Sequence, residues 1–230
     1  MKPPQQYDPV KISTKKRILD AALELFSRRG FSAVSVRDIA AAVGVRESAL
    51  YKHFPSKKAV FDQLVTDYLA KSDAFMAGIH ALPTADPAEL SQRAALYGQY
   101  TDENFLRIGG SVFTDFLMHP DVLRFWRMVS IERFNNENLA KMWNQQFFEE
   151  PIAYQTRLFD LIISIGAMQP IDPSLLALEF YTPLVFLYQQ ALPFEPDGPE
   201  FARALELSNR HMRHFRETYA IQTHAIYPGK

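Results

Sequence analysis

Residues 18–60 read ILDAALELFSRRGFSAVSVRDIAAAVGVRESALYKHFPSKKAV, and this stretch decides the fold. Apolar side chains recur at every third or fourth position from Lys15 to Arg29, which is the spacing of one face of an amphipathic helix. Gly30 comes next, and glycine readily takes the left-handed conformation that ends many helices. The spacing therefore predicts a helix over 15–29 that this glycine closes.

Two shorter helices are predicted next along the chain. Ser35 and Asp38 have the spacing of a capping box, in which a hydroxyl and a carboxylate bond the amides at a helix start. The helix expected behind them covers 36–43, another short helix is expected over 46–53, and a much longer one begins at Lys57. Two short helices that are joined by a glycine-bearing turn and packed on a third helix form a helix-turn-helix.

The second short helix presents a polar, basic and aromatic face. Its inward positions are Val45, Ala49 and Leu50. The outward positions are therefore Arg46, Glu47, Ser48, Tyr51, Lys52 and His53. A face of this chemistry suits the major groove of DNA. A corner between two helices is also common as plain architecture, so the face alone leaves both interpretations open.

Charge is distributed unevenly along the chain. Residues 1–60 contain 12 Lys and Arg against 5 Asp and Glu, whereas residues 61–230 contain 13 against 21. The formal net charge of −1 thus combines a basic head with an acidic body. This asymmetry favours a nucleic-acid partner for the head, although charges also cluster on solvated faces by chance.

The same stretch resembles the N-terminal DNA-binding domain of the tetracycline-repressor (TetR) family. The resemblance covers about a fifth of the chain, and its matching pieces are residues 22–26, 30–31, 35–40, 42–45 and 50–57. The sequence departs from the family at Arg46 and Glu47, where a serine or threonine often opens the recognition helix. This departure concerns the base preference and not the family.

The resemblance implies which side chains contact DNA. Arg37, Arg46, Glu47, Ser48 and Lys52 would face base edges or nearby phosphates, and arginine pairs well with guanine. The sugar-phosphate backbone would be contacted by Tyr51, His53 and Lys57. Ser35 would serve as a helix cap and as a phosphate ligand, because the amides at a helix start attract anions.

The rest of the chain is predicted to be helical throughout. Proline and capping signals place helix starts at about 87, 121, 151, 173 and 199, and no strand-like alternation is present. The expected fold class is all-α, with a three-helix helix-turn-helix domain over 1–60. A larger helical domain for ligand binding and dimerisation is expected over 61–230.

Two segments of the body, 152–168 and 175–192, are apolar on more than one face. Such a helix is buried in a core or in an interface. The family resemblance implies an interface, because the last two long helices of family members form a four-helix bundle between two subunits. A monomer core is the alternative. The residues expected at the dimer interface are Leu158, Ile162, Ile165, Phe180, Leu184 and Leu187.

Residues 97–154 are rich in aromatic and methionine side chains. Pockets for small apolar ligands are lined with such residues, and so are ordinary cores. The family resemblance favours a pocket for an apolar or aromatic ligand. The residues expected to line it are Tyr97, Phe113, Phe116, Trp126, Trp143 and Tyr154.

Enzymatic, metal and membrane functions have little support in the sequence. It contains no cysteine, phosphate-binding glycine loop, nucleophile elbow or His-Glu-x-x-His motif, so no catalytic residue, metal or cofactor is assigned. His211, His214 and Glu217 share one helix face, which we interpret as solvated and basic. No apolar stretch reaches the length of a membrane span, and the first residues do not resemble a secretion signal, so a cytoplasmic protein is expected.

The sequence therefore predicts a homodimeric transcriptional regulator. It would act as a repressor that an apolar or aromatic small molecule releases from a palindromic operator in double-stranded DNA. The alternative is a DNA-binding protein of the same fold that a protein partner regulates and that has no small-molecule pocket.

Overall fold

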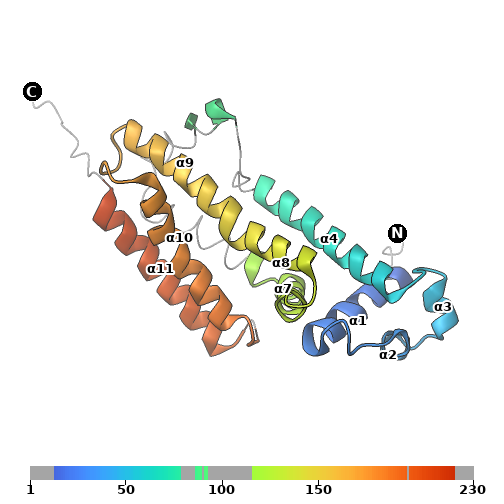
Figure 1. Cartoon of the computed structure of the whole chain (residues 1–230). Coiled ribbons are helices and arrows are strands. Elements are labelled where there is room, and N and C mark those ends of the chain that lie inside the picture. Colours follow the sequence, from blue (N-terminus) through green and yellow to red (C-terminus); the bar gives the residue numbers. More distant parts are fainter. Residues whose placement is uncertain (1–12, 79–85, 90, 93–115, 196, 221–230) are drawn as a thin grey trace, which may run out of the picture.

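The computed structural model describes residues 13–78, 86–89, 91–92, 116–195 and 197–220. The regular structure of these residues is helical, and they include no β-strand beyond one isolated bridge between Met168 and Ala220. The prediction of an all-α fold with a small N-terminal head and a larger helical body is confirmed (Figure 1).

Three helices form the head. They are α1 (Thr14–Arg29), α2 (Val36–Val43) and α3 (Glu47–Tyr51). Gly30 follows α1 at φ 77° and Gly44 follows α2 at φ 73°, in the region that favours glycine. Both predicted helix ends are thus confirmed.

The long helix α4 (Lys57–Gly78) runs from the head to the body (Figure 1). The hydroxyl oxygen of Ser56 accepts a hydrogen bond from the amide of Ala59 at 3.0 Å and caps its start. The first turns of α4 already bury Val60 and Phe61 in a core that continues through both parts of the chain. The expected boundary between residues 60 and 61 therefore falls inside α4, and it stays a prediction.

The body contains further helices among its described residues. α7 (Pro120–Glu132) is followed by α8 (Glu137–Asn144), by the π-helical turn η2 (Gln145–Glu149) and by α9 (Glu150–Ser164). The last two helices are α10 (Pro173–Ala191), which contains Pro183, and α11 (Pro199–Tyr219). Proline occupies one of the first two positions of α7, α9, α10 and α11, as the predicted helix starts require.

Two apolar clusters hold the molecule together. The larger cluster contains residues of α1, α2, α3 and α4, and also of α7, α8 and the second half of α10. The smaller one lies where α9, α10 and α11 meet, around Phe159, Ile162 and Phe215. Helix α7 lies at the centre, between the head and the α9–α11 layer (Figure 1). In the part of the chain that the structure describes, no helix combines the length and the apolar character that crossing a membrane requires.

Candidate nucleic-acid interface and its junction with the body

The capping box at the start of α2 forms as the sequence predicts. The hydroxyl oxygen of Ser35 accepts a hydrogen bond from the amide of Asp38 at 3.1 Å. The Oδ2 atom of Asp38 accepts hydrogen bonds from the amide of Ser35 at 2.8 Å and from its hydroxyl at 2.7 Å. The two bonds that Asp38 accepts hold its pKa below the usual range, and the bond from the backbone amide of Ser35 has a larger effect than the bond from the hydroxyl. The start of α2 is thus fixed by its own side chains.

The turn between α2 and α3 is fixed by backbone bonds and by α1. The amide of Val45 donates to the carbonyl of Ala40 at 2.9 Å, and the guanidinium of Arg17 donates to the carbonyl of Val43 at 2.5 Å. Ala40 is 2% exposed and Leu50 is 0% exposed, so both helices press their inner faces on the head's core. This packing sets which side of α3 remains outside.

The polar residues expected to contact DNA lie on the surface of the head. Among them, the large aromatic side chain of Tyr51 is 50% exposed. The exposed residues are Ser35, Arg37, Arg46, Glu47, Ser48, Tyr51, Lys52 and His53. Within the described residues, Arg37, Arg46 and Lys52 form no ion pair with a carboxylate. Three cations therefore remain available for phosphates or base edges.

Lys57 has a different position from the one expected of a phosphate ligand. Its Nζ atom donates to the carbonyls of Phe31 and Val34, both at 2.7 Å, and lies 4.1 Å from the centre of the Phe31 ring. The side chain is partly buried. Lys57 thus ties the start of α4 to the corner between α1 and α2, and a phosphate contact would have to replace these bonds.

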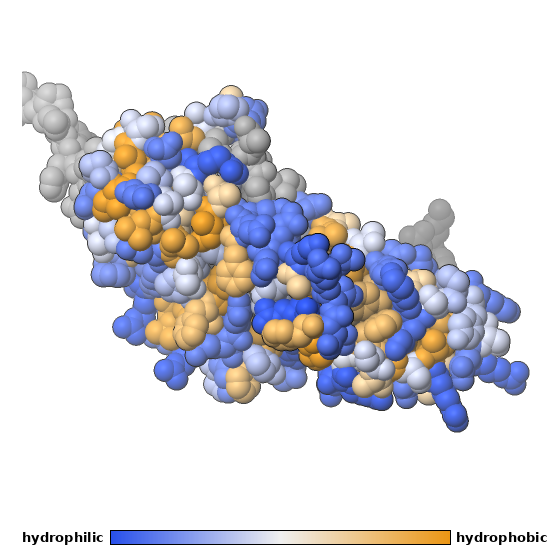
Figure 2. Space-filling model, in the orientation of Figure 1, coloured by the Kyte–Doolittle hydropathy of each residue, from blue (hydrophilic) through white to orange (hydrophobic). Residues whose placement is uncertain are grey.

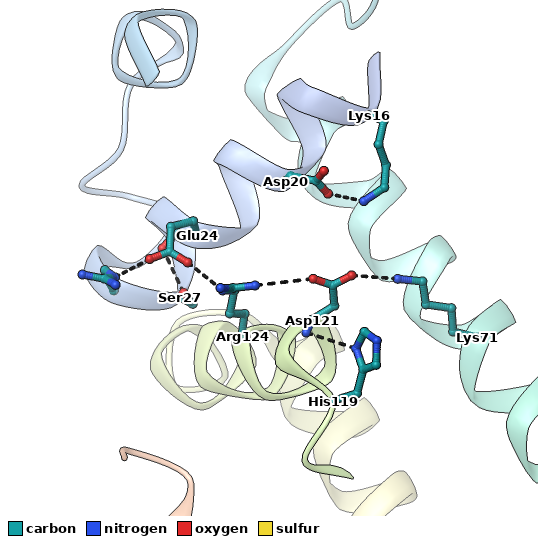
Figure 3. Close-up of polar contacts among 9 residues, drawn as sticks. Lys16, Asp20, Glu24, Ser27, Lys71, His119, Asp121 and Arg124 are labelled. Carbon is teal, nitrogen blue, oxygen red and sulfur yellow. Dashed lines mark hydrogen bonds and ion pairs between the residues drawn. The ribbon is translucent and has the colours of Figure 1, made fainter. Parts of the chain in front are cut away.

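A chain of charged side chains connects the head to the body (Figure 3). The carboxylate of Glu24 in α1 lies 2.6 Å from the Nε atom of Arg124 in α7. Arg124 approaches Asp121 at 3.5 Å, and Asp121 accepts a hydrogen bond from Lys71 of α4 at 3.1 Å. The ion pairs therefore join α1, α7 and α4 around one junction.

Asp121 is the carboxylate at the centre of this junction. Its partial burial by itself raises its pKa, because burial penalises the charged form. The hydrogen bond from Lys71 and the charges of Lys71, Lys16 and His119 outweigh the burial. The pKa of Asp121 consequently lies below its ordinary value, and the junction keeps this carboxylate charged.

Three of the four described residues of the expected ligand pocket, Phe116, Trp126 and Trp143, lie in a packed aromatic cluster. The rings of Trp126 and Trp143 are 5.6 Å apart, and Phe147 lies 4.4 Å from Trp126. Phe116 is buried beside Tyr68, whereas Tyr154 is partly buried in α9. Tyr97 and Phe113 lie outside the described residues. The Nε1 atom of Trp143 is buried and has no hydrogen-bond partner among the described groups.

The expected dimer-interface residues divide into three groups. Ile162 is 0% exposed inside the smaller cluster, so it is a core residue of the subunit and not a surface residue. Four others are partly buried, namely Leu158, Phe180, Leu184 and Leu187. Ile165 is 51% exposed. Periodicity could not separate these groups, because both segments are apolar on several faces.

The apolar segment 175–192 is expected at an interface, but the apolar side chains that α10 exposes most are not among the residues named for it. Leu175, Leu178 and Phe186 are 47%, 48% and 58% exposed, and they lie at helical spacing along one side of the helix. Figure 2 shows apolar side chains gathered where α9 ends and α10 begins. Where α10 ends and α11 begins, Leu187, Phe194 and Leu207 line a groove of about 320 Å³.

The histidine motif of α11 is not simply a solvated face. His211 is partly buried, and its Nε2 atom lies 2.9 Å from the carbonyl oxygen of Phe180 in α10. His214 and Glu217 are exposed, as expected. No group of histidine, aspartate and glutamate side chains that could hold a metal ion occurs among the described residues.

The comparisons with known proteins support the assignment of the head. Residues 18–64 match the family described as "Bacterial regulatory proteins, tetR family". The HTH-type transcriptional repressor KstR2 of Rhodococcus jostii (strain RHA1) is 39% identical over 67 residues, which are 29% of this chain and 33% of the repressor. The match thus spans about a third of the length of the curated relatives.

Solved structures resemble the whole described fold. SmeT is the repressor of a multidrug efflux pump of Stenotrophomonas maltophilia. The structure of its complex with triclosan matches with a TM-score of 0.59 at 18% identity, and the match covers 91% of this chain and 93% of SmeT. The ketosteroid transcriptional regulator KstR2 of Mycobacterium tuberculosis has a TM-score of 0.56 at 21% identity and covers 93% of this chain and 98% of the regulator. At these identities the likeness concerns the fold.

Proposed function

Since the chain belongs, through residues 18–64, to the tetR family of bacterial regulatory proteins, we propose that it is a homodimeric transcriptional repressor. Its head, residues 1–60, would bind a palindromic operator, and residues 61–230 would dimerise and bind an apolar or aromatic small molecule that releases the DNA. The observation that carries this proposal is the exposed set of polar and basic side chains on α3 and at the start of α2.

The DNA contacts follow from the chemistry of this exposed set. Positive charge comes from Arg37, Arg46 and Lys52, which form no ion pair with a described carboxylate. The exposed side chains of Tyr51 and His53 add hydrogen-bond donors for the sugar-phosphate backbone of the DNA. In a dimer, each recognition helix would enter one major groove, with the two heads about 34–36 Å apart or at a multiple of that spacing.

The exposed side of α10 supports a dimer. Leu175 and Leu178 lie one helical turn apart, Phe186 follows further along the same side, and each leaves about half of its surface exposed in the single subunit. Exposed apolar surface of this kind often marks an interaction site. A second copy of the chain that packs its own α10 there would bury both patches symmetrically.

The ligand class is proposed from the body's aromatic character and from the structural neighbours. The buried indole N–H of Trp143 is a donor that a ligand's hydrogen-bond acceptor could satisfy. SmeT, one neighbour of similar fold, forms a complex with triclosan, and another neighbour is a ketosteroid transcriptional regulator. We extend to this chain only the general class, an apolar or aromatic molecule.

Selection from a pool of random duplexes tests the DNA-binding proposal. The purified chain would be incubated with the pool at about 150 mM salt, where non-specific contacts are weakened, and the retained duplexes would be sequenced. We expect enrichment of a palindrome. An Arg46→Ala and Lys52→Ala double variant serves as the matched control and should retain less of it. Retention without enrichment would overturn the operator proposal.

The packing of the described aromatic rings favours a second candidate function. Trp126, Trp143 and Phe147 contact one another and are at most 5% exposed, as in a filled core. A protein partner on the body would then regulate DNA binding in place of a small molecule. Screening the chain against a library of apolar and aromatic compounds separates the two, because a ligand that lowers affinity for the selected duplex excludes the partner-only alternative.

A further inference from the structure

Glu132, the last residue of α7, bonds the head through its carboxylate. Its Oε1 atom accepts a hydrogen bond from the amide of Phe31 at 2.7 Å, and the residue is only 8% exposed. Within the described part of the chain, no lysine or arginine forms an ion pair with Glu132. A buried carboxylate is costly unless it is hydrogen-bonded. The described group that stabilises it there is a backbone amide of the head.

Gly30 gives this carboxylate its space. Its φ of 77° favours glycine, and a Cβ atom at this position would lie 2.7 Å from Oε1 of Glu132 and 3.0 Å from Cγ2 of Ile131. A larger residue at position 30 would collide with the side chains of Ile131 and Glu132 and would displace the carboxylate. Gly30 and the end of α7 are far apart in the sequence, and they are in close contact at this point.

The opposite side of the same corner is bonded to α4. The Nζ atom of Lys57 donates to the carbonyl of Phe31, whose own amide donates to Glu132. The Phe31 ring packs on Phe26 and Phe61 at 5.4 and 5.2 Å. One residue of the head is thus held at its amide by α7, at its carbonyl by α4 and at its ring by the core.

We infer that Glu132 is a positioning residue that fixes the helix-turn-helix on the body through the amide of Phe31. Ser35, which caps α2, follows this corner within four residues, so the corner's position sets the direction of α2 and α3. Without the acceptor the head samples other orientations, and DNA binding must then restrict it. The effect on DNA rests on the proposed function, whereas the bond to Phe31 does not.

The test compares Glu132→Met, which removes the acceptor, with Glu132→Gln, which keeps an amide oxygen in its place. Glu137→Gln is the charge control, because Glu137 is exposed on α8. Affinity for the duplex selected from the random pool is measured by fluorescence anisotropy, and hydrogen exchange of the Phe31 amide is measured by NMR. Exchange of amides in α9 to α11 reports whether each variant keeps its fold.

We expect Glu132→Met to weaken duplex binding about tenfold and to raise exchange at Phe31 about tenfold, while α9 to α11 keep their protection. Glu132→Gln should recover most of both effects. Wild-type exchange at Phe31 in the methionine variant would overturn the inference, as would equal losses in the two variants. If the wild-type chain selects no duplex, the proposed function fails, and exchange at Phe31 alone decides the role of Glu132.

Discussion

Trp126 of α7 donates its indole N–H to the phenol oxygen of Tyr68 in α4, 2.9 Å away and wholly inside the protein. The Tyr68 ring also stacks on Phe125 with ring centres 4.0 Å apart. The bond and the stacking hold α7 against α4 at the point where α4, which runs from the head, enters the body. Burial is the main cause that raises the pKa of the Tyr68 phenol, so the hydroxyl stays protonated over the ordinary pH range.

Tyr68→Phe should therefore destabilise the protein. The ring is kept but the buried N–H of Trp126 loses its acceptor, which costs about 1–3 kcal/mol in the free energy of unfolding. Urea unfolding followed by tryptophan fluorescence measures this difference. Tyr51→Phe removes a hydroxyl from a half-exposed ring and should leave the unfolding midpoint unchanged. Equal midpoints for all three proteins would show that the bond contributes nothing.

Asp38 makes the stability of the head depend on pH. Its pKa in the folded protein lies below that of the unfolded chain, which is about 3.9 for an ordinary aspartate. The capping box therefore stabilises the head fully above this value and loses its contribution as pH falls through the folded-state pKa. We expect the free energy of unfolding to decrease with falling pH below about pH 4.

Two variants isolate this contribution. Asp38→Asn cannot titrate and should make the acid dependence shallower. Ser35→Ala removes the hydroxyl bond but keeps the backbone bond to Asp38, so it should do so only in part. Urea unfolding at a series of pH values measures the slopes. If neither variant changes the slope of the wild-type protein, the capping box does not cause it.

Much of the head could be predicted from the sequence because its signals are local. The capping box of Ser35 and Asp38 and the turns at Gly30 and Gly44 depend on a few neighbouring residues and on backbone conformations that few residue types accept. Proline likewise marked the helix starts of the body. Each of these signals depends on residues within about one helical turn, so it can be recognised without knowledge of the tertiary packing.

The contacts of the body depended on packing that no local pattern encodes. Ile162 could not be separated from surface residues because its helix is apolar on several faces. Glu132 was missed, although one signal was available, since it follows Phe125 and Val129 at helical spacing and so continues a buried stripe. An acidic residue at a position where the helical spacing requires an apolar one indicates a buried polar contact. Only the structure identifies the amide of Phe31 as the hydrogen-bond donor to Glu132.

Lys52 and Lys57 should differ in their effect on DNA binding. Lys52 is exposed and forms no ion pair with a described carboxylate, so Lys52→Ala should lower the salt slope of duplex binding by about one. Lys57→Ala removes two bonds to backbone carbonyls and should instead lower the free energy of unfolding by about 2 kcal/mol. Anisotropy titrations at several salt concentrations and urea unfolding measure both. A salt slope lowered by Lys57→Ala would show that its ammonium exchanges the carbonyls for a phosphate.

Leu178→Asp should separate the proposed dimer. Leu178 lies on the exposed side of α10 between Leu175 and Phe186, so a charge there would be buried without a partner when two copies associate. Leu69→Asp is the matched control, since this leucine is also exposed but lies on α4. Sedimentation velocity should detect a dimer for the wild-type chain and for the control and a folded monomer for Leu178→Asp. An unchanged dimer in the Leu178 variant would place the interface on another face, and a wild-type monomer would overturn the dimer itself.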